Sequence, residues 1–445
     1  MKHRNSITII SQTRKFLPAI LLSILTVNFF CIGKKELELE NNSRNLKNKT
    51  TAFIYNAIPH DQQASISSDY SEAINTFSVK LLGKVYSDTK FNKKNVILSP
   101  FSVSRCLAAL AEGSTGVSKK ELVETLGGEA ALDDARSALS ELLYADNSVI
   151  FQCADAIWTD SVKYSINPVF KNNAKQKFGV QFAGLNFSNK KTTAATINNW
   201  ISTNTDNNLS DVIIPEMIDP ERALFFTNAV YFKADWASPF DITQTGQDIF
   251  HSPSGDVSTD MMSSNYLHKI RKTGIYENVR LYYGTTNTDY FYLDIYMPVS
   301  GSIESFLDSS CLSALSNNEP SDYGSLVMPK FFFKTDVDLI PMLKEMGLNQ
   351  IFDLANMDFS EIVSYKNGNQ LPPLYVNLIK HIAGIETSEE GTKAYTVTVM
   401  GITVGSAGSE EPENIILNKP FVYFIRAGEN GLVLFAGVVN NPGMK

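Results

Sequence analysis

The segment Gly391–Val404 restricts what this chain can fold into more than any other part of the sequence. It carries one charged residue among fourteen, contains no proline and is rich in β-branched residues. Every residue in it can donate its backbone N–H, so the segment can enter the middle of a β-sheet. A Gly/Ser-rich stretch and the acidic residues Glu410, Glu411 and Glu413 follow it, and these are instead typical of an exposed loop.

A strand-forming segment that stays in solvent is normally an aggregation hazard. Two interpretations remain open: an ordinary edge strand followed by a loop, or a loop that inserts into a sheet later. Side chains alternate between the two faces of a strand, and here the two faces differ. One face carries small side chains, those of Thr392, Ala394, Thr396 and Thr398. The other carries larger ones, those of Lys393, Tyr395, Val397 and Val399.

Residues 67–445 have the pattern of one folded domain, without repeats, long Gly/Ser linkers or low-complexity tracts. Hydrophobic residues make up 43% and charged residues 19% of the chain, which excludes a wholly disordered chain and a coiled coil. Apolar residues at helical spacing predict a helix over Asp69–Tyr86. Ser118 as N-cap, with Glu121 at the capping-box position, predicts a second helix that ends at Leu126.

Apolar, β-branched runs predict the strands of this domain. They lie at Val149–Trp158, Leu224–Phe232, Tyr290–Met297, Leu326–Phe333 and Leu374–Ile385, with a hairpin formed by Phe421–Arg426 and Leu432–Val438. Helices come mainly first and strands mainly later, so we expect an α+β fold.

The first thirty residues have the pattern of a signal peptide. Basic residues precede the apolar run Phe16–Phe30, which is shorter than the about twenty residues that a membrane-spanning helix needs. Cys31 follows directly, so a bacterial lipoprotein acylated at Cys31 and a secreted protein remain alternatives. Residues 31–66 are polar and without periodicity, which predicts a flexible tether. We therefore expect an extracellular protein, with a lipid anchor as its only contact with a membrane.

The composition excludes several function classes. The net charge of −8 argues against a nucleic-acid partner. The chain has five histidines and none of the common metalloprotease, nucleophile-elbow or phosphate-binding motifs, so we predict no metal, no cofactor and no enzymatic activity. Its four cysteines show neither metal-ligand spacing nor the pattern of a disulfide framework.

Four segments together resemble the serpin family over essentially residues 70–443. They are Asn95–Val103, similar to the start of helix B; Thr227–Phe240, similar to strand 3A; His381–Thr392, similar to strand 5A and the reactive-loop hinge; and Asn418–Pro442, similar to the C-terminal signature. The resemblance implies a large mixed sheet A with sheets B and C, about eight or nine helices and an exposed reactive-centre loop.

The resemblance also implies a mechanism for the unusual segment. A target protease cleaves the loop as if it were a substrate and forms an acyl-enzyme. The cut loop then inserts as a new strand of sheet A, between Phe225–Phe232 and Leu374–Ile385, and traps the enzyme. The chain would thus be a serine protease inhibitor that acts as a suicide substrate, which makes it a trap and not a catalyst. A non-inhibitory serpin that acts as a surface binding protein is the alternative.

The family's functional residues transfer by motif. The shutter, a buried polar cluster beneath the opening sheet, would comprise Ser99, Ser102, Asn228 and His381, and Trp236 would form the breach at its top. The hinge would comprise Glu389, Glu390, Gly391, Thr392, Ala394, Thr396 and Thr398. Counting from Glu389 places the reactive bond at Gly405–Ser406, with Val404–Gly405 as the alternative.

The residues around this bond predict the class of partner. They are small, and no Lys or Arg lies between Ala394 and Asn418. A narrow, elastase-like specificity pocket therefore fits better than a trypsin-like one. We expect a monomer that binds an elastase-like serine protease, with a cysteine protease as a further possibility.

Overall fold

The structure of the chain is a computed structural model. It describes residues 66–142, 144–145, 148–205, 207, 210–284, 290–317, 319–353, 360–366, 375–376, 378–392 and 413–444. All of these belong to one of two units of the chain, Tyr55–Lys445. The expected signal peptide and Cys31 lie outside the described residues.

The described residues contain nine α-helices. They are α2 (Ser68–Ser87), α3 (Pro100–Glu112), α4 (Gly116–Thr125), α5 (Glu129–Leu142), α6 (Pro168–Phe178), α7 (Lys190–Asn204), α8 (Ile303–Ser309), α9 (Cys311–Ser316) and α10 (Ile340–Glu345). The first matches the predicted helix over Asp69–Tyr86, and Ser67 caps it by accepting a hydrogen bond from the backbone of Tyr70. None of the helices in the described part of the chain is long and apolar enough to cross a membrane.

The start predicted for α4 is wrong. The helix begins at Gly116, after Thr115, and Ser118 is buried inside it. Glu121 does not close a capping box: its carboxylate accepts hydrogen bonds from the backbone of Asn349 and of Gln350, each at 2.7 Å. A partner distant in sequence therefore replaced the local cap, because a charged acceptor binds exposed backbone donors strongly wherever they approach it.

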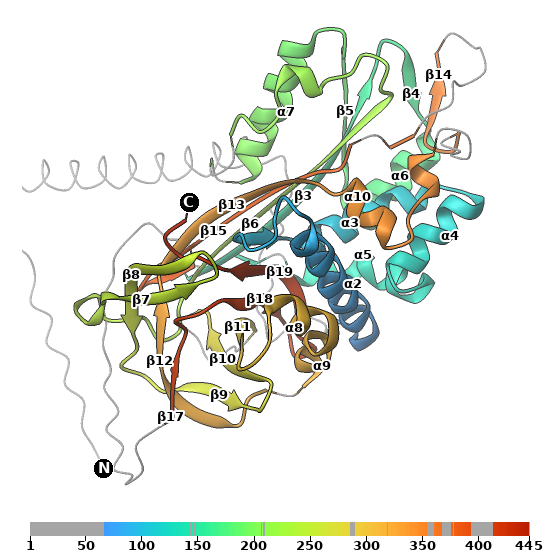
Figure 1. The fold of residues 1–445 in the computed structure, drawn as a ribbon. Helices are drawn as coiled ribbons and strands as arrows, with labels where there is room; N and C mark the ends of the chain where they lie inside the picture. The colour runs from blue at the N-terminus through green and yellow to red at the C-terminus, as the bar shows by residue number, and fades with distance from the viewer. Residues whose placement is uncertain are drawn as a thin grey trace, which may run out of the picture. The chain divides into compact units, whose positions relative to one another are not determined.

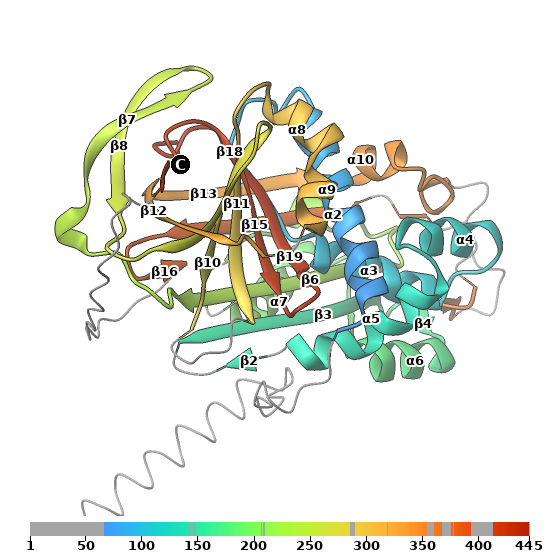
Figure 2. The same cartoon turned by 90° about the horizontal axis from the view of Figure 1, so that it is seen from below.

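One sheet of seven strands runs through the described residues (Figure 1). Its order is β13 (Phe331–Asp338), β15 (Lys380–Thr387), β16 (Gly391–Thr392), β6 (Leu224–Asp235), β3 (Val149–Asp160) and β2 (Tyr144–Ala145), with β5 (Gln181–Leu185) parallel to β3. The neighbours along this order pair antiparallel. Helix α7 covers one face, whereas α3 and the second sheet lie against the other (Figures 1 and 2).

The second sheet has ten described strands. Its order is β1 (Val96–Leu98), β19 (Leu432–Val439), β18 (Phe421–Ala427), β11 (Phe291–Pro298), β10 (Tyr276–Tyr282), β9 (His268–Lys272), β12 (Asp322–Pro329), β8 (Gly255–Ser263) and β7 (Gly246–Ser252), with β17 (Glu413–Ile416) parallel to β12. A further pair joins β4 (Tyr164–Ile166) and β14 (Val363–Tyr365). The predicted C-terminal hairpin is confirmed as β18 and β19, both buried along their whole length.

One predicted strand, Leu326–Phe333, is wrong, since it is two strands in different sheets. Strand β12 ends at Pro329 in the ten-stranded sheet, and β13 begins at Phe331 in the seven-stranded one. Pro329 has no N–H to continue a ladder. The next residue, Lys330, donates its backbone N–H to Asp260 at 2.9 Å and lies at the crossing between the sheets. The strand predicted over Leu374–Ile385 is described as Lys380–Thr387, and Leu374 lies outside the described residues.

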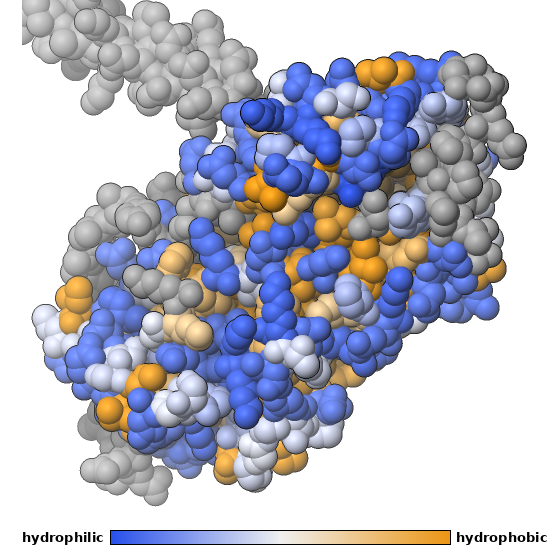
Figure 3. Space-filling model, turned by 45° about the horizontal axis from the view of Figure 1, so that its top comes forward, coloured by the Kyte–Doolittle hydropathy of each residue, from blue (hydrophilic) through white to orange (hydrophobic). Residues whose placement is uncertain are grey.

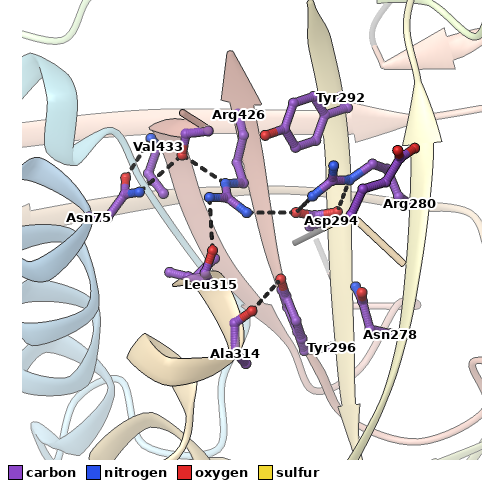
Figure 4. Close-up of polar contacts among 12 residues, drawn as sticks. Asn75, Asn278, Arg280, Tyr292, Asp294, Tyr296, Ala314, Leu315, Arg426 and Val433 are labelled. Atoms are coloured by element: carbon purple, nitrogen blue, oxygen red, sulfur yellow. Dashed lines mark hydrogen bonds and ion pairs between the residues drawn. The ribbon is translucent and has the colours of Figure 1, made fainter. Parts of the chain in front are cut away.

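The ten-stranded sheet contains a buried charge cluster (Figure 4). Asp294, with no exposed surface, accepts hydrogen bonds from Arg280 at 2.7 and 2.8 Å and from Arg426 at 2.9 Å. Arg426 also donates to the backbone oxygens of Gly431 and Leu315. The ring of Tyr292 lies 4.0 Å from the Arg280 guanidinium. The cluster links three adjacent strands, β10, β11 and β18, to the turn that joins β18 to β19.

Candidate functional site

The seven-stranded sheet is incomplete between β15 and β6. At one end the two residues of β16 fill the space: Thr392 pairs with Thr387 of β15 and with Ala234 of β6. Beyond β16, no pairing in the described part of the chain joins β15 to β6. Because β15 pairs with β13 and β6 pairs with β3 on their far sides, two long strands present facing edges that, beyond β16, no other described strand pairs with.

A cavity of about 140 Å³ lies at this gap. Residues of β15 and β6 line it on two sides, and residues of α3 line a third, among them Ser99, Ser102 and Cys106. Figure 3 shows hydrophobic residues reaching the surface in a band across the middle of the body. The gap is therefore backed by a mixed wall of apolar and hydroxyl-bearing side chains, to which both α3 and strands of the ten-stranded sheet contribute.

The predicted shutter residues meet at this wall. The backbone N–H of Ser99, the N-cap of α3, donates to Nε2 of His381 at 3.0 Å. Ser102 donates its hydroxyl to the Asn228 side chain, and Asn228 donates to Asp155 at 2.6 Å. Thus β15 and β6 each bind the first turn of the same helix, through separate hydrogen bonds.

The protonation state of His381 follows from its surroundings. Burial lowers the pKa of His381 to about 4, because a charged imidazolium would lose its hydration there. Its Nε2 accepts a hydrogen bond, so the ring is neutral and carries its proton on Nδ1. Protonation would place a second donor against the Ser99 N–H and break this contact between β15 and α3.

The described hinge residues form a tight turn at the filled end of the gap. Ser388 and Gly391 close the turn with a hydrogen bond of 2.9 Å. A Cβ atom on Gly391 would lie 2.2 Å from the backbone oxygen of Ala234, so only glycine fits this approach. The backbone oxygens of Glu389 and Glu390 accept hydrogen bonds from Phe240 and Trp236, each at 2.8 Å.

Trp236, the predicted breach residue, lies beside this turn. Its indole N–H donates to the oxygen of Ser388 at 2.9 Å, and its ring stacks on Tyr283 with centroids 4.7 Å apart. The hydroxyl of Tyr283 lies 2.6 Å from the hydroxyl of Thr392, and burial raises the pKa of Tyr283 well above its ordinary value. Tyr283 thus holds the side chain of Thr392 on the inner face of the sheet.

Glu389 is held by a partly buried ion pair. Its carboxylate lies 2.9 Å from Nζ of Lys330 and accepts a hydrogen bond from Thr245 at 2.9 Å. Burial by itself would raise the pKa of Glu389, but the hydrogen bonds from Lys330, its own backbone and Thr245, with the charge of Lys330, hold that pKa below its ordinary value. The carboxylate therefore ties the start of the hinge to the point where β12 passes into β13.

Sequence reasoning missed Asp155, Arg105, Lys330, Thr245 and Tyr283. The charges of Asp155 and Arg105, each alone in an apolar run, were the available signal, because a buried charge needs a partner. Other predicted site residues lie outside the described residues: hinge residues Ala394, Thr396 and Thr398, the reactive bond Gly405–Ser406 with its alternative at Val404, and Cys31.

Comparison with known proteins decides which family has this arrangement. A family model described as "Serpin (serine protease inhibitor)" matches residues 72–442, most of the chain. The chain belongs to the serpin family. Serpins are in general protease inhibitors and not catalytic enzymes, and the α+β fold expected for the family, with its large sheets, is confirmed.

Individual serpins resemble the chain over nearly their whole length. Plasminogen activator inhibitor 1 from Bos taurus is 27% identical over 397 residues, which cover 86% of this chain and 94% of that protein. The Arabidopsis AtSerpin1 structure, described as a native stressed conformation, is 26% identical, with a TM-score of 0.73, and covers 85% of this chain and 100% of its own. Human thyroxine-binding globulin, solved in complex with its hormone, has the same fold at 22% identity and a TM-score of 0.73, covering 85% and 100%.

Proposed function

We propose that this serpin inhibits a serine protease as a suicide substrate, by inserting its cleaved reactive loop between β15 and β6. The observation that carries the proposal is the position of Gly391–Thr392. These first two residues of the strand-forming segment already lie in the sheet, at the end of a gap that no other strand of the described residues fills. Insertion would extend a strand whose first pairs already exist.

The register of β16 defines where the following residues would fall. Strand β16 is antiparallel to both neighbours, so each step forward in the loop is one step back in β15 and β6. In the inserted state Ala394 would lie opposite Ile385 and Phe232, and Thr396 opposite Ala383 and Val230. Thr398 would arrive between the shutter residues His381 and Asn228.

The same register agrees with the alternation of small and large side chains in the segment. Thr392 is 3% exposed and faces Tyr283, so the face that it shares with Ala394, Thr396 and Thr398 would turn toward α3 and the core. Small side chains suit this buried face. The larger side chains of Lys393, Tyr395, Val397 and Val399 would turn to the opposite face, where α7 and solvent lie. The bulk of this second set therefore does not obstruct insertion.

Insertion would carry a bound protease far from its starting point. About fourteen residues at about 3.3 Å each make a strand of about 46 Å. A catalytic triad fails when its groups move by about an ångström, so displacement on this scale arrests the acyl-enzyme. The uncut protein must hold the free energy for this change, because the inserted strand forms backbone pairs that the uncut sheet lacks.

Cleavage of the loop distinguishes inhibition from the alternative of a non-inhibitory binding protein. The midpoint of thermal unfolding should rise by tens of degrees on cleavage, because the facing edges become paired. Thr396→Arg, on the inward face, should turn the inhibitor into a substrate that is cleaved without a stable complex. Its matched control, Val397→Arg on the outward face, should still form the complex. Unchanged melting after cleavage would favour the binding protein.

We propose an elastase-like protease as the partner, supported by the small residues around Gly405–Ser406. Incubation with a protease panel should give a detergent-resistant complex with elastase and none with trypsin. The released C-terminal fragment should begin at Ser406. Gly405→Arg should reverse the preference, because an acidic specificity pocket then has a cation to bind. A wild-type complex with trypsin and none with any elastase would contradict the assignment, and cysteine proteases belong in the same panel.

We also propose that the protein is exported, either secreted or lipid-anchored at Cys31, and acts as a monomer without a cofactor. The apolar run before Cys31 supports export. Cys31→Ser should release the protein from the membrane fraction if the anchor exists, and should change nothing if the protein is secreted. Labelling with radioactive palmitate measures the acyl chain directly.

A further inference from the structure

Three long strands of the seven-stranded sheet bind one row of residues along α3 and its N-cap. The strands are β15, β6 and β3, and the residues that they bind follow at intervals of three along the helix. Ser99 binds His381 of β15, Ser102 binds Asn228 of β6, and Arg105 binds Asp155 of β3. Residues three apart form a ridge along a helix, so the strands cross this ridge one after another.

The third contact differs from the others in strength. Arg105 donates to one carboxylate oxygen of Asp155 through Nε at 3.1 Å and through Nη2 at 2.9 Å. Both side chains are buried, with 0% and 7% exposed. A charged pair of this kind holds more strongly than the neutral contacts of Ser99 and Ser102, and breaking it leaves both charges in an apolar surrounding.

The contacts divide the molecule into two parts at the gap. Helix α3 is attached to the ten-stranded sheet, since the hydroxyl of Ser99 donates to Leu434 of β19 at 2.8 Å. On the β13 and β15 side, Ile97 just before α3 donates its backbone N–H to Thr335 at 2.8 Å. Strands β6 and β3 are attached to α3 through the side chains of Asn228 and Asp155.

Opening the gap strains the attachments of β6 and β3. A new strand needs about 4.8 Å on each side along its whole length, and wherever the gap has to widen to give this room, a hydrogen bond stretched by more than about 1 Å is lost. Arg105 is long, but it cannot follow β3 freely, because its Nη2 also donates to the backbone oxygen of Phe178 at 2.6 Å. Asp155 further accepts from Asn228, so the ion pair fixes the side chains on both moving strands.

We propose that the Arg105–Asp155 ion pair is the brake that sets how fast β6 and β3 separate from β15, with Asp155 as the residue that positions Asn228. The inference rests on the proposed function, since a brake on opening matters only if a strand enters. The brake acts on the rate of opening.

The test measures entry of a strand into the uncut, full-length protein. A synthetic acetylated peptide with the sequence of residues 391–404 is added, and the complex is followed by native electrophoresis. The double variant Arg105→Met, Asp155→Asn removes both charges and keeps an acceptor for Asn228. It should anneal the peptide at least about tenfold faster than wild type, the change that loss of about 1.4 kcal/mol from a barrier produces.

Two further variants separate the brake from general loss of stability. Arg105→Lys keeps the charge but loses the fork geometry, so it should accelerate annealing only about two- to fivefold. Arg280→Met removes a buried cation from the ten-stranded sheet while Asp294 keeps Arg426. It should lower the free energy of unfolding and leave the annealing rate unchanged.

Equal rates for wild type and the double variant, or equal acceleration by Arg280→Met, would overturn the proposal. If the double variant does not fold, Arg105→Lys decides, and a wild-type rate then counts against the brake. The proposed inhibition is tested separately, by complex formation with proteases. A wild-type protein that anneals the peptide but traps no protease would refute inhibition, while the order of annealing rates would still decide the brake.

Discussion

Two buried Arg–Asp clusters use the same chemistry in regions that must behave differently. Arg105 and Asp155 join a helix to a strand beside the gap, where the sheet has to open. Arg280, Asp294 and Arg426 join adjacent strands that are already paired, β10, β11 and β18. An ion pair between parts that move apart raises a barrier, whereas one within a closed sheet stabilises that sheet before and after the movement. Position relative to the gap, and not chemistry, decides which effect a cluster has.

The largest effect should come from Asp294→Leu. The substitution leaves two buried arginines without a counter-charge, which costs about 4–5 kcal/mol or more of the free energy of unfolding. The loss should be similar in the uncut and the loop-cleaved protein, because β10, β11 and β18 are paired in both. Denaturant unfolding of both forms measures it. A loss confined to the uncut form would place this cluster in the moving part.

Asp155→Leu should lower the free energy of unfolding of the uncut form more than that of the cleaved form. It leaves Arg105 unpaired and removes the acceptor of Asn228, so the uncut protein should lose about 3 kcal/mol. If opening already breaks the pair, the cleaved protein should lose less than about 1 kcal/mol. The same denaturant titrations give both values, and equal losses in the two forms would remove the contrast between the clusters.

Acid should lower the free energy of unfolding through two buried histidines, one at each end of the gap. Burial lowers the pKa of His381, in the shutter, and that of His268, which stacks on Phe240 beside the hinge, each to about 4 from 6.5. A lowered pKa means that the unfolded chain binds the proton more readily, so the stabilisation is complete above about pH 6.5 and is lost as pH falls toward 4. Each histidine should lower the free energy of unfolding by about 2 kcal/mol as the pH falls from about 7 to 5.

His381→Gln separates the two contributions. The variant should keep the part of the pH dependence that belongs to His268 and lose the other half. Unfolding free energies of both proteins across this pH range provide the measurement. An identical slope in variant and wild type would show that His381 is not held neutral in the folded protein.

The smallest effect should come from Glu389→Gln at the hinge. Lys330 is about one-third exposed, so solvent screens the ion pair and its loss should cost about 0.5–1 kcal/mol. The peptide should nevertheless anneal faster, since the first hinge residue is less firmly held. Asp336→Asn, which breaks the more exposed ion pair with Lys380 on β13 and β15, is the control and should leave annealing unchanged.

Much of the fold was predictable because it depends on local pattern. The apolar runs around Phe225 and Tyr423 are strands, and the helical spacing around Phe77 forms α2. Family motifs located the shutter and the breach, and the structure brings Ser99, Ser102 and Asn228 together at one end of α3. The failures are places where a distant partner overrode a local signal. Glu121 binds the backbone of Asn349 and Gln350 instead of closing a capping box, and the run around Pro329 passes from one sheet to the other.

By itself, the sequence determined an α+β fold, with helices mainly first and strands mainly later, and a strand-forming segment with one small-residue face. Those properties follow from residue type and spacing, which act over a few neighbours. Only the tertiary structure decided that Gly391 and Thr392 already occupy the gap, that Lys330 holds Glu389, and that Arg105 finds Asp155. Such pairings join residues tens to hundreds of positions apart, and nothing in local spacing selects one distant partner over another until the chain has folded.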